Sequence, residues 1–156
     1  MRISRPQMYM QIAEIIARRS TCNRGNVGAI IIENKNIVSM GYNGPAAGEA
    51  HCGDQCDMTQ GCTRSTHAEM NAISKAPPQR GSRDLYITLS PCLSCCKTLA
   101  FDHDIDQIFF KEEYRDISGL ELVSEECIEV YQIIPNGIIF DWKNNVVVDS
   151  HTLYRT

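Results

Sequence analysis

The sequence predicts one three-layer α/β domain, in which helices cover both faces of a mixed sheet. The chain has 156 residues, 43% of them hydrophobic and 22% charged, which suits a compact domain. Helical and strand-like patterns alternate along it, and the later part fits strand–helix–strand crossovers. No internal repeat, low-complexity tract or linker interrupts residues 1–156, so we expect one domain over the whole range.

The first elements are a helix and a hairpin. Residues 5–19 place Met8, Ile12, Ile15 and Ile16 at helical spacing, which predicts an amphipathic helix whose core face includes Met8, Ile12 and Ile16. Two β-branched runs follow, at 27–32 and 36–42, and predict an antiparallel hairpin.

Residues 44–65 are polar and lack a hydrophobic period, which is unusual inside a domain unless the loop is functional or tied down. Beyond this loop the chain alternates again. We expect helices at 66–76, from Ser90-Pro91 to about 101, and at 118–126. The strands are predicted at 85–89, 106–110, 128–134 and 138–142. Residues 143–156 stay unassigned, with Val146 to Val148 an edge strand, a subunit contact or a tail.

The net charge and the hydropathy of the chain limit the classes of partner that it is expected to bind. The net charge of −4 disfavours bulk attraction to a nucleic-acid backbone, although a local pocket for one phosphate is compatible with it. No apolar run approaches the roughly 20 residues of a membrane helix, and the start does not have the pattern of a signal peptide. We therefore expect a cytoplasmic protein without a membrane or duplex nucleic-acid partner. In that reducing compartment the eight cysteines indicate metal ligands before disulfides.

Two short motifs at predicted helix starts carry the chemistry. His67-Ala68-Glu69 opens one helix, and Pro91-Cys92-Leu93-Ser94-Cys95 opens the next. His67, Cys92 and Cys95 offer three ligands, which for zinc leaves a fourth position for water, as a catalytic site requires. Zinc makes such water acidic near neutral pH, and Glu69 is predicted to carry protons between water and substrate. The alternative is a structural zinc that joins two helices.

The combination H-x-E with P-C-x-x-C is the signature of zinc-dependent nucleobase deaminases. Together with residues 22–29, 41–44, 67–73 and 88–92, it resembles the deoxycytidylate (dCMP) deaminase family over about residues 5–148. The resemblance implies a three-layer α/β/α cytidine-deaminase-like fold with a five-stranded mixed sheet, the hairpin antiparallel and the later strands parallel. It also implies hydrolytic deamination of dCMP to dUMP and ammonia, which supplies thymidylate synthesis.

A second group of cysteines suggests a second, structural zinc. The loop carries the spacing H-C-x3-C-x5-C, and a closed tetrahedral site needs four ligands. We expect these to be Cys22, Cys52, Cys56 and Cys62, with His51 as an alternate. The metal would order the loop, and members of the resembled family hold a second zinc here with varying ligands. The alternative is buried, reduced cysteines. Cys96 and Cys127 are left without a metal role.

The candidates for substrate binding offer groups that suit a sugar hydroxyl or a phosphate: Arg24, Asn26, Asn43, Arg64, Ser90 and Tyr114. Asn43 suits a sugar hydroxyl, and the alternative is a plain turn residue. Tyr114 stands where the family places a tyrosine on the substrate phosphate, whereas Arg24 and Arg64 are equally typical of surface residues.

Regulation follows from the resemblance alone. Family members are hexamers that are activated by dCTP with Mg²⁺ and inhibited by dTTP, and they bind the effector near a Gly-Tyr-Asn-Gly turn. Here that turn is Gly41-Tyr42-Asn43-Gly44, which on its own is also just a turn.

Two other functions stay open at this point. One is another deaminase of the same fold, acting on tRNA adenosine, cytosine or cytidine; the acidic balance disfavours tRNA. The other is a non-catalytic, zinc-stapled nucleotide-binding module.

Overall fold

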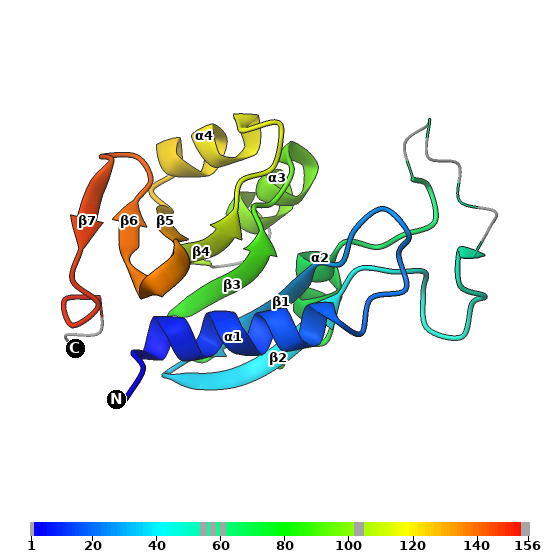
Figure 1. Ribbon diagram of the computed structural model, residues 1–156, viewed down its shortest axis with the longest axis horizontal. Coiled ribbons are helices and arrows are strands. Elements are labelled where there is room, and N and C mark those ends of the chain that lie inside the picture. Colours follow the sequence, from blue (N-terminus) through cyan, green and yellow to red (C-terminus); the bar gives the residue numbers. More distant parts are fainter. Residues whose placement is uncertain (1, 54–55, 57–58, 60–61, 102–104, 154–156) are drawn as a thin grey trace.

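The computed structural model describes residues 2–53, 56, 59, 62–101 and 105–153 (Figure 1). These residues form one mixed sheet of seven strands in the order β2-β1-β3-β4-β5-β6-β7. The helices are α1 (Arg5–Ala17), α2 (Ala68–Ser74), α3 (Leu93–Phe101) and α4 (Ser118–Glu125), with a short 3-10 turn at Pro135–Gly137. The strands are β1 (Gly28–Glu33), β2 (Asn36–Tyr42), β3 (Arg83–Leu89), β4 (Gln107–Glu112), β5 (Glu129–Ile133), β6 (Ile139–Asp141) and β7 (Val146–Val148).

The middle of the sheet is parallel and both sides are antiparallel. The pairs β3/β4 and β4/β5 are parallel, as expected for strands joined through α3 and α4. The pairs β2/β1, β1/β3, β5/β6 and β6/β7 are antiparallel. The α/β class is thus confirmed.

The prediction of five strands, with the later ones parallel, was wrong at the carboxyl end of the chain. A tight turn at Pro135–Gly137, where Asn136 and Gly137 both have positive φ, returns the chain directly beside β5. A parallel strand would need a crossover of a dozen or more residues, which this connection lacks. β6 therefore runs antiparallel, and β7 adds a further edge strand from part of the segment that the sequence left unassigned.

One face of the sheet is covered by α1 (Figure 1). Its buried side presents Tyr9, Ala13 and Ala17, and a Cβ placed on Gly28 of β1 would overlap the backbone of α1. The helix therefore packs almost directly on the sheet through small side chains. The predicted core role of Met8 was wrong, because this residue is 38% exposed. Ile12 and Ile16 are partly buried and pack against this core, as predicted.

The other face is covered by α2, α3 and α4. Their buried side chains, including Ala72, Leu99 and Leu120, pack with residues of β1, β3, β4 and β5 into one apolar cluster. The three-layer α/β/α arrangement is therefore present. The carboxyl ends of β3 and β4 meet at one edge of the sheet, next to the start of α2, and ligands of α/β proteins bind at such edges.

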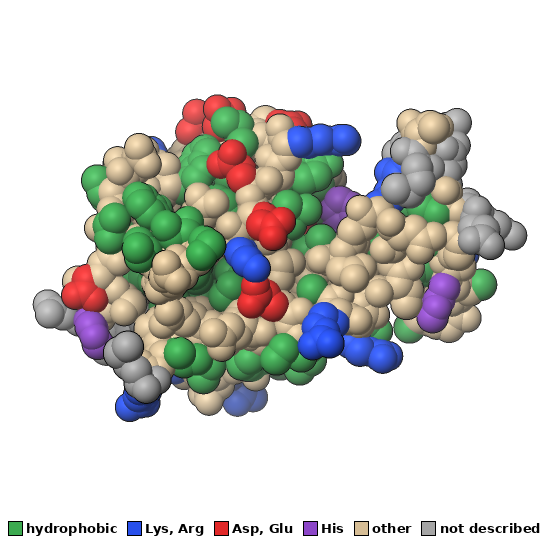
Figure 2. All heavy atoms as spheres, in the orientation of Figure 1, with side chains coloured by type: hydrophobic (Ala, Val, Ile, Leu, Met, Phe, Trp, Pro, Cys, Tyr) green, Lys and Arg blue, Asp and Glu red, His purple; other side chains and the backbone are tan. Residues whose placement is uncertain are grey.

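The surface carries mixed charge. On the face drawn in Figure 2, acidic and basic side chains are interspersed, without a continuous basic area. Within the described residues, no helix combines the length and apolar character needed to cross a membrane.

Candidate active site

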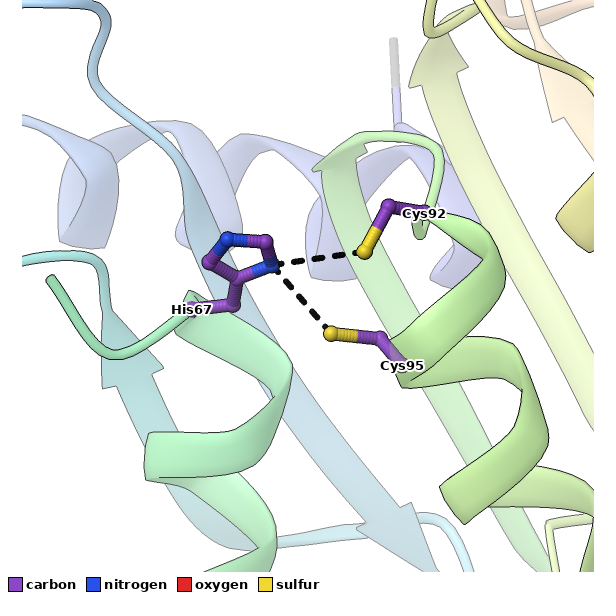
Figure 3. Close-up of side chains that lie close together, drawn as sticks. All are labelled: His67, Cys92 and Cys95. Atoms are coloured by element: carbon purple, nitrogen blue, oxygen red, sulfur yellow. Dashed lines mark hydrogen bonds between the residues drawn. The ribbon is translucent and has the colours of Figure 1, made fainter. Parts of the chain in front are cut away.

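Three side chains from two neighbouring helix starts face one another (Figure 3). His67 immediately precedes α2, and its ring makes no capping bond to that helix. Cys92 immediately precedes α3, and its carbonyl accepts the Cys96 N–H at 2.9 Å, so it occupies the cap position. Side chains at a cap and three residues later lie close together, which brings Cys92 and Cys95 to the same side. The predicted start of this helix at Ser90-Pro91 was early, because α3 begins at Leu93.

The three ligand atoms have the spacing of a zinc site. His67 Nδ1 lies 3.2 Å from Cys95 Sγ and 3.6 Å from Cys92 Sγ, and all three atoms lie within 4.8 Å of one another. Tetrahedral zinc with ordinary bond lengths separates its nitrogen and sulfur ligands by about 3.5 Å. Two thiols and one imidazole are also a donor set that zinc prefers. The residues fit the metal, and three ligands leave one position open, as in catalytic zinc sites.

The pKa values of the three groups are shifted in different directions. The hydrogen bond from Cys95, followed by the bond with His67, lowers the pKa of the Cys92 thiol to about 4. The same bond with Cys92, together with burial, raises the pKa of Cys95. The contact with Cys92 also raises the pKa of His67, against the opposing effect of burial. Without metal the site therefore holds one thiolate beside a proton-rich pair, and metal uptake must displace protons.

Glu69 lies in the first turn of α2, and its side chain is only 3% exposed. Burial raises the pKa of its carboxyl, partly offset by hydrogen bonds. The residue lines the same cavity as His67 and Cys92. A buried carboxyl with a raised pKa beside a candidate metal site has the properties of a group that exchanges protons during catalysis.

The cavity in front of these residues measures about 300 Å³. Of the residues predicted for substrate binding, Arg24, Asn43, Ser90 and Tyr114 line it. Apolar side chains of Val27, Ala68 and Leu89 complete the wall. The site thus combines an apolar slot with a few polar groups, as small-molecule sites do.

Ser90 and Tyr114 are joined across the sheet edge. Ser90 is buried at 3% exposure, its N–H donates to the Glu112 carbonyl at 2.8 Å, and its Oγ accepts the Tyr114 N–H at 2.8 Å. The segment after β4 is therefore fixed to the segment that precedes the metal ligand Cys92.

Other predicted residues lie elsewhere. Asn26 and Arg64 are not among the residues that line the cavity, and Arg64 donates to the Ala50 carbonyl at 2.9 Å. The prediction of a turn at Gly41–Gly44 was wrong, because Gly41 and Tyr42 are the last two residues of β2 and Gly44 forms a β-bridge with Thr66. A Cβ on Gly41 would overlap the backbone of α2, and the Tyr42 carbonyl accepts from Asn71 Nδ2 at 2.8 Å.

The two residues that follow β2, Asn43 and Gly44, are also held by hydrogen bonds. Asn43 Oδ1 accepts the Val27 N–H at 2.8 Å, and its Nδ2 donates to the Gly25 carbonyl at 2.9 Å. Gly44 exchanges two backbone hydrogen bonds with Thr66. Packing and hydrogen bonding thus account for each of the four positions.

The cysteines predicted for a second zinc are not brought together in the described residues. Within 2–53, 56, 59, 62–101 and 105–153, the group His67, Cys92 and Cys95 is the only set of three or more candidate ligands whose atoms all lie within 4.8 Å. Cys22 and Cys62 both line the catalytic cavity, and Cys52 is buried. Parts of the predicted metal-stapled loop 44–65 lie outside the described residues.

Arg115 is a cavity residue that sequence reasoning missed. It lines the cavity beside Tyr114, and its guanidinium carbon lies 5.6 Å from the centre of the Tyr114 ring. Its position directly after Tyr114 in the charged run 111–116 was the available signal. Arg24 and Arg115 give the cavity two cationic side chains in a protein of net negative charge.

Comparisons with known proteins agree with this geometry. Residues 3–111 match the family described as "Cytidine and deoxycytidylate deaminase zinc-binding region". The chain is 38% identical to the ComE operon protein 2 of Bacillus subtilis, over 92% of this chain and 78% of that protein. It is 31% identical to the deoxycytidylate deaminase of Mycobacterium phage D29, over 71% of this chain and 99% of that protein.

A solved structure is similar as well. The dCMP deaminase of cyanophage S-TIM5, in complex with dCMP and dUMP, superposes with a TM-score of 0.72 at 30% identity. The match covers 81% of this chain and 94% of the phage chain.

Proposed function

Because the chain belongs to the cytidine and deoxycytidylate deaminase family, we propose that it hydrolyses the 4-amino group of dCMP, giving dUMP and ammonia. This proposal rests on the three candidate ligands His67, Cys92 and Cys95, which lie close together. Two of them, His67 and Cys92, line one cavity with buried Glu69. Relatives named deoxycytidylate deaminase, one of them solved with dCMP and dUMP, support dCMP as the substrate. The product dUMP would feed thymidylate synthesis.

The chain's own residues have defined tasks in this reaction. Zinc held by His67, Cys92 and Cys95 supplies the Lewis acidity that makes water nucleophilic near neutral pH. Glu69 accepts the two protons of the water that adds to C4 one after the other. It passes the first to the ring nitrogen and the second to the amine, which leaves as ammonia. The apolar wall around Leu89 excludes bulk water from this exchange.

Polar residues of the cavity are proposed to hold the nucleotide. Asn43 lies on the wall with one N–H of its amide uncommitted to the two bonds described above, which suits a sugar hydroxyl. Tyr114, with Arg24 and Arg115 on the same cavity, suits a single phosphate. Ser90 places Tyr114 through its hydrogen bond and faces the cavity itself.

A second zinc on Cys22, Cys52, Cys56 and Cys62, with His51 as alternate, is also proposed. The support is chemical: the polar loop 44–65 contains three of these cysteines, and such a loop gains order from a metal. Since Cys22 and Cys62 line the cavity, this metal would also shape the substrate site. Metal analysis of the pure protein, expected to give two zinc ions per chain, tests it; one zinc per chain would contradict it.

Activation by dCTP with Mg²⁺, inhibition by dTTP and a hexameric assembly rest on family resemblance alone. The proposed effector site includes Gly41, Tyr42, Asn43 and Gly44. Assays of dCMP turnover with each nucleotide, and the mass of the assembly by light scattering, test these properties directly.

The decisive experiment is ammonia release from dCMP by zinc-loaded protein, compared with CMP, dCTP, deoxycytidine and cytosine. We expect dCMP to be the preferred substrate. Nucleotide binding without turnover would instead favour a non-catalytic module.

Glu69→Gln tests the proton carrier. We expect kcat to fall by about 10²- to 10⁴-fold, because a positioned acid–base group contributes that much, while the zinc content stays unchanged. Glu121→Gln, which changes an exposed carboxylate on α4, is the matched control and should keep full activity. Retained turnover in Glu69→Gln would remove Glu69 from this role.

A further inference from the structure

Helix α4 lies directly against the backbone that carries the zinc ligand Cys92, and the contact is made through Gly119. Gly119 is buried in the first turn of α4. A Cβ added there would lie 2.8 Å from Cys96 Sγ, 3.0 Å from the carbonyl carbon of Cys92 and 3.0 Å from the amide nitrogen of Leu93. Two of these three atoms belong to the peptide bond between Cys92 and Leu93.

This contact has little room to relax. Backbone atoms cannot swing aside as the end of a flexible side chain can, so a methyl group at position 119 must displace either α4 or the Cys92 peptide. The Cys96 side chain is fully buried and its thiol donates to the Pro91 carbonyl at 3.6 Å, which holds the sulfur in place. Leu120 and Val123 of the same helix are fully buried in the core cluster that also contains Cys96, which holds α4 in place.

The same metal-bearing segment is also fixed at its other end. Ser90 donates its N–H to the Glu112 carbonyl and accepts the Tyr114 N–H, each at 2.8 Å. The segment from the end of β4 to the first turn of α4 thus contacts residues 90–93 at two places. Hydrogen bonds hold Ser90, and Gly119 packs closely against the peptide that follows Cys92.

We infer that Gly119 is a positioning residue for the zinc site, because the absence of a side chain at this position sets where the Cys92 backbone lies. Zinc ligands must hold their geometry within a few tenths of an ångström. Residues that orient ligands typically change metal affinity or activity by about 10- to 100-fold when altered. The inference rests on the zinc site of the proposed function.

Gly119→Ala is the test, with zinc affinity measured by competition with a chelating dye. Alanine ordinarily favours a helix over glycine, so helix propensity alone predicts an equally or more stable protein. Overpacking alone would lower the unfolding temperature without changing the metal site. We expect instead about a 10- to 100-fold loss of zinc affinity, and a changed thiolate-to-metal absorption band in the cobalt-substituted protein. Zinc affinity and cobalt spectrum equal to those of the wild type would overturn the inference.

Val123→Ala is the matched control, since it removes buried atoms one turn further along the same helix and adds no atom against the Cys92 peptide. It should lower thermal stability and leave zinc affinity unchanged, which separates positioning of Cys92 from general weakening of α4. Loss of affinity equal to that of Gly119→Ala would contradict the inference.

A double variant decides the case in which Gly119→Ala fails to fold. Gly119→Ala with Cys96→Ala removes the sulfur that a new Cβ meets at 2.8 Å, but keeps the two backbone contacts at 3.0 Å. Its zinc affinity should fall below that of Cys96→Ala alone, and equal affinities would overturn the inference. These measurements need no substrate. Wild-type protein that binds zinc but does not deaminate dCMP would contradict the proposed function only. An active Gly119→Ala variant with unchanged zinc affinity would contradict the inference about Gly119 only.

Discussion

Replacing Asp84 by asparagine should stabilise the protein above neutral pH without affecting catalysis. Asp84 lies near the start of β3, between Ile32 of β1 and Gln107 of β4. Burial raises the pKa of its carboxyl to about 7, and the nearby charges of Asp106 and Glu129 add to the rise. The folded protein therefore disfavours the ionised form of this side chain.

The size and sign of the effect follow from the two pKa values. The carboxyl has a pKa of about 7 in the folded state and of about 3.9 in the unfolded chain. Below about pH 4 it is protonated in both states and has no effect. Between the two values the folded state holds a proton that the unfolded state has lost, so the free energy of unfolding falls as pH rises, and above the folded pKa the loss is complete.

Three pKa units at about 1.4 kcal/mol each set an upper limit of about 4 kcal/mol for this loss. Asp84 is only partly buried, and solvent screening reduces the value to about 1–3 kcal/mol. Asparagine carries no charge and so avoids the loss. The gain from Asp84→Asn should reach about one third of its final size at pH 5 and level off above about pH 7.

Urea unfolding of zinc-saturated wild type and Asp84→Asn at pH 5, 6, 7 and 8 measures this difference. Glu125→Gln, a change of an exposed carboxylate on α4, is the control and should stay within about 0.5 kcal/mol at each pH. The value of kcat for dCMP should not change, since the cavity lies at the opposite end of β3, at Leu89. A gain that is independent of pH, or a loss at pH 8, would refute the reasoning.

Two further predictions concern the metal and the hairpin. Zinc must displace the proton of Cys95 and, at low pH, that of His67, because the pKa values of both groups are raised. The affinity for zinc should therefore rise by about 10- to 100-fold per pH unit. Calorimetry in buffers of different ionisation enthalpy measures the protons released, and no proton release would contradict this prediction. Lys35→Gly should stabilise the protein by about 0.5–1 kcal/mol in thermal unfolding, because Lys35 has a φ of 65° in the two-residue turn between β1 and β2; an unchanged or lower unfolding temperature would count against strain at this turn.

Helix α1 illustrates where sequence periodicity was insufficient. The pattern correctly located the helix, but it favoured Met8 for the core, whereas Tyr9 and Ala13 are the buried residues. Large apolar side chains dominate a periodicity argument, yet this helix approaches β1 so closely that small residues face it at Gly28. The distance between a helix and a sheet depends on the residues of the strand that it packs against, and the sequence of the helix alone does not contain them.

Some residues of the candidate site could likewise be predicted from local sequence and others could not. His67, Glu69, Cys92 and Cys95 could be identified from sequence, because each pair is separated by only two or three residues at a helix start, where local geometry fixes side-chain direction. Arg115 had only its place after Tyr114 as a signal, since it reaches the cavity only when the end of β4 lies next to the end of β3.

The sequence by itself determined the α/β class of this protein and identified the candidate zinc ligands with the carboxyl near them, because these depend on short-range patterns and spacing. The tertiary structure alone decided which polar residues share the cavity, how the last two strands run, and that α4 approaches the zinc ligand Cys92 at Gly119. The physical reason is that these features are contacts between segments far apart in the chain. The distances between these segments are set by how the sheet and helices pack together. That packing depends on the whole chain, so no short residue pattern predicts it.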